Sequence, residues 1–68
     1  MTVSQTKINH FGKVFKVKLD EADAYADERR AIERDTWTPV GIFGNTFRFK
    51  NKAGRKICLY KKTQLIPL

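Results

Sequence analysis

The segment NTFRFKNKAGRKICLYKKTQ, residues 45–64, carries two arginines and five lysines and contains no acidic residue. Several of these cations alternate with apolar residues, which is the pattern of a β-strand that exposes one face. Phosphate oxygens accept hydrogen bonds from Arg and Lys, and neutralising a polyanion releases its counterions. Tyr60 adds a ring on which a base can stack. The segment therefore predicts a surface that binds nucleic acid.

Two paired strands are needed to bring these cations together. If residues 52–54 form a three-residue loop with the glycine in the left-handed conformation, Lys50 lies directly opposite Lys56. A four-residue loop would instead mix apolar and basic side chains on both faces, which a half-buried sheet penalises. The three-residue loop is therefore predicted. It places four apolar residues on the other face of the hairpin: Phe47, Phe49, Ile57 and Leu59.

The predicted site is the exposed face of this hairpin, with lysines of an N-terminal strand as auxiliary contacts. Facing lysines at positions 50 and 56 destabilise the pair by about 0.2–1 kcal/mol, which a bound phosphate backbone would relieve. The alternative interpretation is that lysines on an edge strand only prevent aggregation. The expected contacts with DNA or RNA are Arg48, Lys50, Arg55, Lys56, Tyr60, Lys62, Lys16 and Lys18.

All seven acidic residues of the chain lie within residues 20–35, between two arms that carry only basic charges. Asp20 is a good helix N-cap, and acids in a first turn interact favourably with the helix dipole. The segment is also rich in alanine. A helix is therefore predicted over Glu21–Asp35, with Tyr25 and Ile32 as its large apolar anchors.

The exposed face of this acidic helix has two interpretations. In the first, it is a solvated surface with Asp27–Arg30 and Glu33–Arg29 ion pairs. In the second, it contacts a protein, or it repels nucleic acid and so confines binding to the hairpin. The sequence leaves both open.

The remaining segments have strand character. Apolar residues alternate from Phe11 to Leu19, and after the helix the segments VGIFG, TFRFK and KICLYKK have strand character, with room for a short final strand at residues 65–68. The string GIFG, residues 41–44, favours a bulge or close turn that lets Ile42 and Phe43 pack. The predicted fold is small α+β: an antiparallel sheet in the order β-α-β-β with one helix packed across it.

Length and composition restrict the size of the domain, the metal or cofactor sites it can hold and its location. A chain of 68 residues is expected to be one small domain, residues 1–68, with a thin core. A single cysteine, Cys58, forms no internal disulfide, and one histidine, His10, gives no metal-ligand cluster, so no cofactor or metal is expected. No segment approaches the roughly 18 apolar residues of a membrane span. A cytoplasmic location is therefore expected, or a nuclear one if the source is eukaryotic.

Two functions fit these features. The first is a non-catalytic nucleic-acid-binding domain, because nothing near His10 supports its use as a general base. The second is a small inhibitor or adaptor, of the kind that phages and mobile elements encode, which binds a host protein. Both use a basic face, so charge alone does not separate them.

Overall fold

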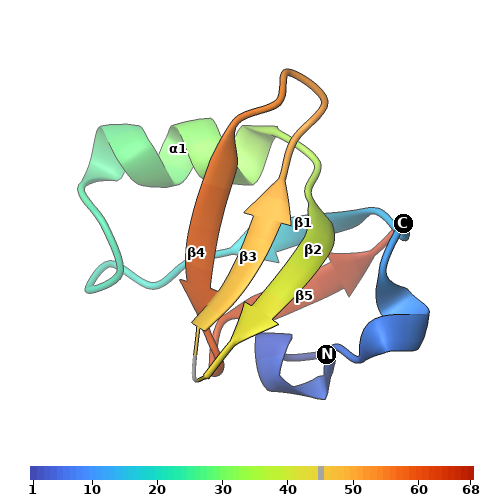
Figure 1. Cartoon of the computed structure of the whole chain (residues 1–68). Coiled ribbons are helices and arrows are strands. Elements are labelled where there is room, and N and C mark those ends of the chain that lie inside the picture. Colours follow the sequence, from blue (N-terminus) through green and yellow to red (C-terminus); the bar gives the residue numbers. More distant parts are fainter. Residues whose placement is uncertain (45) are drawn as a thin grey trace.

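Five β-strands, one α-helix and two short 3-10 helices make up this computed structural model, which describes residues 1–44 and 46–68 (Figure 1). Strand β1 pairs antiparallel with β5, and β2, β3 and β4 form an antiparallel three-stranded sheet. This arrangement confirms the predicted α+β class and the short final strand. The bounds are η1 Val3–Gln5, η2 Ile8–His10, β1 Phe15–Lys18, α1 Ala26–Arg34, β2 Thr38–Phe43, β3 Thr46–Lys50, β4 Lys56–Tyr60 and β5 Gln64–Pro67.

The strands form two sheets rather than the one sheet that the sequence predicted. In Figure 1, β1 and β5 lie behind β2, β3 and β4 and cross them steeply, as in orthogonally packed sheets. An isolated bridge between Phe15 and Trp37 joins β1 to the start of β2. The strand alternation expected from Phe11 begins only at Phe15, because a turn occupies Phe11 and Gly12, where the glycine has φ +90°. Residues 11–14 therefore form no ladder with β2 beyond this bridge.

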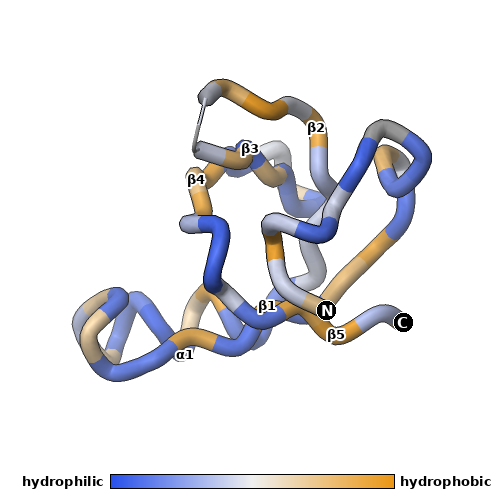
Figure 2. The backbone as a smooth tube through the Cα atoms, turned by 90° about the horizontal axis from the view of Figure 1, so that it is seen from below, coloured by the Kyte–Doolittle hydropathy of each residue, from blue (hydrophilic) through white to orange (hydrophobic). Residues whose placement is uncertain are grey.

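The inner faces of both sheets and the helix meet in a single core. Figure 2 shows apolar stretches in the strands of both sheets, next to hydrophilic ones. The core also includes Trp37, which is fully buried and whose Nε1 donates a hydrogen bond of 2.7 Å to the carbonyl of Ile32. The buried members are Val3, Phe15, Val17, Ile32, Trp37, Phe49, Leu59 and Leu65.

Helix α1 begins at Ala26, later than the predicted start at Glu21. Asp20 does not cap the helix, because it forms a separate turn: its N–H donates to the Asp23 carboxylate at 2.8 Å, and its carbonyl accepts from the Asp23 N–H at 3.0 Å. Short acidic side chains bind nearby backbone groups readily, and here that turn replaces the first turn of the helix. Tyr25 is the extended residue before the helix and is 90% exposed, so its predicted anchoring role is wrong.

Ile32 is buried and anchors the helix, as predicted. Of the two predicted ion pairs, Arg30–Asp27 is present, with 2.5 Å between Nη2 and Oδ1. The Glu33–Arg29 pair is absent within the described residues, because both side chains bind backbone instead. Glu33 accepts from the Leu19 N–H at 2.8 Å, and Arg29 donates to carbonyls of the loop before the helix.

The hairpin of β3 and β4 has the predicted register. Phe49 pairs with Ile57 and Lys50 with Lys56, and the connecting loop places Gly54 at φ +88°. Phe49 is fully buried and Ile57 is half-buried against the core. The apolar and basic faces of the hairpin are therefore separated as the sequence predicted.

Strand β2 contains the predicted irregularity, a register shift between Pro39 and Gly41. The expectation that Ile42 and Phe43 would pack is wrong, since they are 42% and 58% exposed. Phe43 shares a face with Thr46 and Tyr60, away from the core, and Ile42 lies near the end of the edge strand β2.

Candidate nucleic-acid interface

The outward face of the three-stranded sheet is built from three rows of side chains that cross β2, β3 and β4. The strand register defines the rows, because residues paired across neighbouring strands point to the same face. The first row is Phe43, Thr46 and Tyr60, the second is Gly41, Arg48 and Cys58, and the third is Thr38, Lys50 and Lys56. We call these nine residues the outward face.

Arg48 lies at the centre of this face, and Phe43 lies beside it on the edge strand β2. The guanidinium carbon of Arg48 lies 4.8 Å from the centroid of the Phe43 ring, within the range of a cation–π contact. The ring lies over Gly41: a Cβ added to that glycine would be 2.8 Å from Phe43 Cε2. The Phe43 ring can therefore lie over position 41 because that position has no side chain.

The aromatic row exposes two rings. Tyr60 is 72% exposed and Phe43 is 58% exposed, and both pair with Thr46, which lies between them on β3. Neighbouring strands lie about 4.8 Å apart, so the row spans a width of about two strand spacings. Exposed rings on a flat sheet can stack on unpaired bases whatever their sequence.

The lysine row lies at the loop end of the hairpin. Lys50 and Lys56 are exposed and directly opposite each other. Among the described residues the ion pairs are Arg30–Asp27 and Arg55–Glu28, so neither lysine nor Arg48 has an acidic partner. The outward face consequently keeps its positive charge available to an anion.

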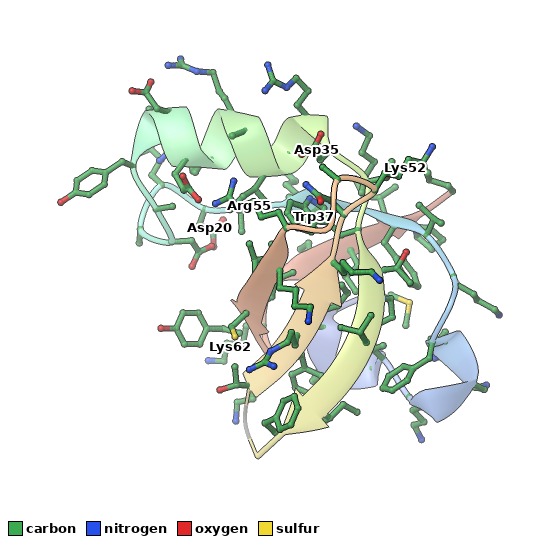
Figure 3. The ribbon with its side chains drawn as sticks, turned by 45° about the horizontal axis from the view of Figure 1, so that its top comes forward. Asp20, Asp35, Trp37, Lys52, Arg55 and Lys62 are labelled. Atoms are coloured by element: carbon green, nitrogen blue, oxygen red, sulfur yellow. The ribbon has the colours of Figure 1, made fainter. Side chains whose placement is uncertain are left out.

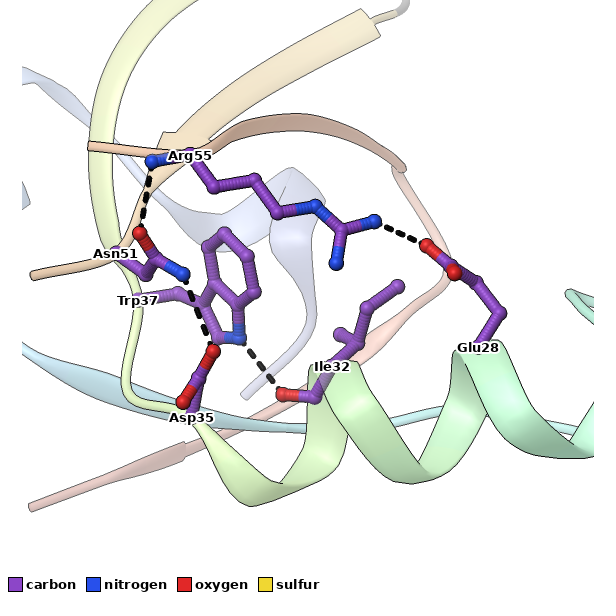
Figure 4. Close-up of polar contacts among 6 residues, drawn as sticks. All are labelled: Glu28, Ile32, Asp35, Trp37, Asn51 and Arg55. Atoms are coloured by element: carbon purple, nitrogen blue, oxygen red, sulfur yellow. Dashed lines mark hydrogen bonds and ion pairs between the residues drawn. The ribbon is translucent and has the colours of Figure 1, made fainter. Parts of the chain in front are cut away.

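Four of the predicted contact residues lie elsewhere. Arg55 turns toward the helix and forms an ion pair with Glu28 (Figure 4). Lys16 is on the other sheet, and its Nζ donates to the carbonyl of Arg34 at 2.6 Å, at the helix end where a cation is favourable. Lys18 is exposed on β1. Lys62 lies in the turn after β4, at the opposite end of that strand from Arg55 (Figure 3).

The hairpin loop is joined to the helix by a polar network. Asn51 Nδ2 donates to the Asp35 carboxylate at 3.1 Å, and Asn51 Oδ1 accepts from the Arg55 N–H at 2.8 Å (Figure 4). Together with the Arg55–Glu28 pair, these bonds bring acidic side chains to the loop end of the hairpin and away from its outward face. The network therefore separates the two signs of charge.

Phe43 is the site residue that sequence reasoning missed. The signal was present: Gly41 and Phe43 are two residues apart in a strand, so they share a face, and a glycine leaves room there for a neighbouring ring. From the sequence alone, Gly41 and Gly44 indicate only a bulge or a close turn that lets Ile42 and Phe43 pack.

The chain matches no protein-family model, no curated protein and no solved structure.

No helix within residues 1–44 and 46–68 has the length and apolar character that a membrane crossing requires. The same residues include no group of three or more His, Cys, Asp or Glu side chains that could hold a metal ion.

Proposed function

We propose that the protein binds nucleic acid, DNA or RNA, through the outward face and without catalysing a reaction. The observation that carries this proposal is the set of three rows, in which aromatic, arginine and lysine side chains are exposed together and have no acidic partner among the described residues. Basic residues interleaved with exposed rings are the combination used by sheet surfaces that bind single strands. The free, exposed thiol of Cys58 is consistent with a reducing compartment, and we propose a cytoplasmic location.

Each part of the face has a physical role in this function. The lysine row and Arg48 neutralise phosphates, and the release of counterions drives binding at low salt. Phe43 and Tyr60 offer stacking surfaces that do not depend on base identity. Binding through such contacts carries little sequence information, because phosphate contacts position a nucleic acid and base-edge contacts specify it.

The test is fluorescence anisotropy of a labelled oligonucleotide at several salt concentrations. If the three cations of the outward face each neutralise one phosphate, log affinity for a single strand should fall with log salt at a slope of about −2. A protein that shows no binding even at the lowest salt, where the electrostatic contribution is largest, would contradict the proposal. That result would favour the alternative of a small protein-binding inhibitor or adaptor.

A matched pair of charge reversals separates the outward face from net charge. Arg48→Glu with Lys56→Glu should abolish detectable binding. Lys7→Glu with Lys18→Glu changes the net charge of +7 by the same amount, at exposed positions outside the face. The control should retain most of the affinity. Equal losses in both variants would mean that net charge alone drives binding.

A further inference from the structure

A cleft of about 520 Å³ opens beside the outward face, along the free edge of β2. The antiparallel bridge between Phe15 and Trp37 joins the start of β1 to the residue before β2, so residues 11–14 are the segment on the β2 side of the bridge. The chain before β1 turns away at Gly12, so the wall formed by residues 11–14 does not pair with β2 beyond the bridge. Its volume falls within the range of about 300–1,000 Å³ that is typical of small-molecule sites.

The cleft is lined by apolar residues of two segments, Phe11 and Val14 before β1 and Pro39 and Val40 on β2, and by the polar residues Thr36, Thr38 and Asn51. Val14 and Val40 are exposed by 37% and 41%. Exposed apolar side chains that face a cleft are the usual lining of a site for a flat organic group.

Two lysines line the same cleft. Lys50 and Lys52 are exposed and, among the described residues, neither forms an ion pair. Lys50 also belongs to the lysine row, so the cleft and the outward face share a residue. A strand of phosphates that crosses the lysine row would therefore reach the rim of the cleft.

The edge of β2 is a poor template for an added peptide strand. Pro39 has no N–H to donate, and the bulge between Pro39 and Gly41 interrupts the regular spacing of the backbone groups. Both features are devices that prevent strand addition at a sheet edge. An apolar slot with a cationic rim instead fits a planar base attached to a phosphate.

We infer that the cleft between residues 11–14 and the edge of β2 holds one unpaired base of a single-stranded nucleic acid, whose phosphates lie on Lys50 and Lys52. This inference rests on the proposed function and names its substrate class. A duplex keeps its bases stacked inside the helix and so cannot fill the cleft without paying the cost of unpairing. The protein should therefore prefer single strands to duplexes.

The test is a titration of ¹⁵N-labelled protein with a short oligothymidylate and, separately, with a duplex of the same length. The single strand should shift the amide signals of Val14, Val40 and Lys52 together with those of the outward face. The duplex should shift only the outward face. By anisotropy, the single strand should bind more tightly than the duplex, and about fivefold of that preference should come from the base in the cleft and be lost in the cleft variants.

Two variants test the cleft itself. Phe11→Ala should lower single-strand affinity about fivefold and leave duplex affinity unchanged. Because Phe11 is half-buried, Val40→Ser at an exposed position provides a second variant that leaves the core intact, and it should weaken single-strand binding in the same direction. The matched control is Ile66→Ser, an exposed apolar residue of β5, which should not change binding.

The outcomes separate this inference from the function on which it rests. Shifts confined to the outward face with both probes, or equal affinity for both, would overturn the cleft site and leave nucleic-acid binding in place. The absence of shifts with either probe would overturn both. A third titration uses an extended peptide. If the peptide shifts the cleft amides and the oligothymidylate does not, the inference is overturned and the cleft is assigned to a protein partner.

Discussion

Arg48 and Phe43 lie on neighbouring strands with the guanidinium carbon 4.8 Å from the centre of the ring. A cation over an exposed ring contributes about 0.5–1 kcal/mol, and it also restricts both side chains to one arrangement on the sheet. The outward face therefore presents a preformed pair rather than two independent side chains. Preorganisation of this kind reduces the side-chain entropy that binding must otherwise cost.

The first prediction is that Arg48→Lys weakens single-strand binding even though it conserves charge. Lysine lacks the planar guanidinium that can lie against both the ring and a base. Phe43→Ala should also weaken binding, by about fivefold, through loss of a stacking surface. Anisotropy on both single variants and the double variant measures the coupling. Losses that simply add would show that the two residues act independently.

The second prediction concerns Gly41. In Gly41→Ala the new Cβ would lie 2.8 Å from Phe43 Cε2, so the ring must leave its place beside Arg48. The free energy of unfolding should change by less than about 0.5 kcal/mol, because only an exposed side chain moves. Binding should fall as it does in Phe43→Ala. In the Phe43→Ala background the same substitution should have no further effect, and an additional loss there would contradict this account of the glycine.

The third prediction is that Ile32→Ala lowers the free energy of unfolding by about 2–4 kcal/mol, measured by urea denaturation. Ile32 is the buried apolar side chain of α1, and a small domain has little stability to lose. Tyr25→Ala is the control: its side chain is 90% exposed, so the change should stay within about 0.5 kcal/mol. A loss below that value for Ile32→Ala would mean that the helix is not packed as described.

The fourth prediction is that Asn51→Ala costs about 1–3 kcal/mol of stability. The substitution removes the side-chain bonds to Asp35 and to the Arg55 N–H, at a position that is only 9% exposed. Lys52→Ala, one residue further along the loop, should have little effect on unfolding. Thermal denaturation measures the loss of stability in both variants. Equal losses would show that the loop network adds nothing to stability.

The hairpin could be predicted from the sequence because its signals are local and agree. A two-residue alternation, a glycine at the left-handed position and the separation of apolar from basic faces all require the same register, in which Lys50 faces Lys56. Four of the proposed contacts, Arg48, Lys50, Lys56 and Tyr60, follow from that register without further information.

The start of the helix and the division into two sheets could not be predicted in the same way. Asp20 suits a helix cap and a turn equally well, and its choice depends on Asp23 and on how the loop is held by Arg29. The role of Lys16 was missed for a similar reason. The alternation of apolar and basic residues in the strand predicts that Lys16 is exposed. Its Nζ instead binds the carbonyl of Arg34, at the end of a helix that is distant in the sequence.

Trp37 joins three elements at one residue. Its indole N–H binds the last turns of α1 through the Ile32 carbonyl, and its own N–H and carbonyl each bond to Phe15 at 2.8 Å. Undocking of the helix would leave this fully buried indole without its partner, and separation of the strands would expose the same ring. Helix and sheets should consequently open as a single cooperative unit, in which the amides of Phe15 and Trp37 exchange with solvent only through global unfolding.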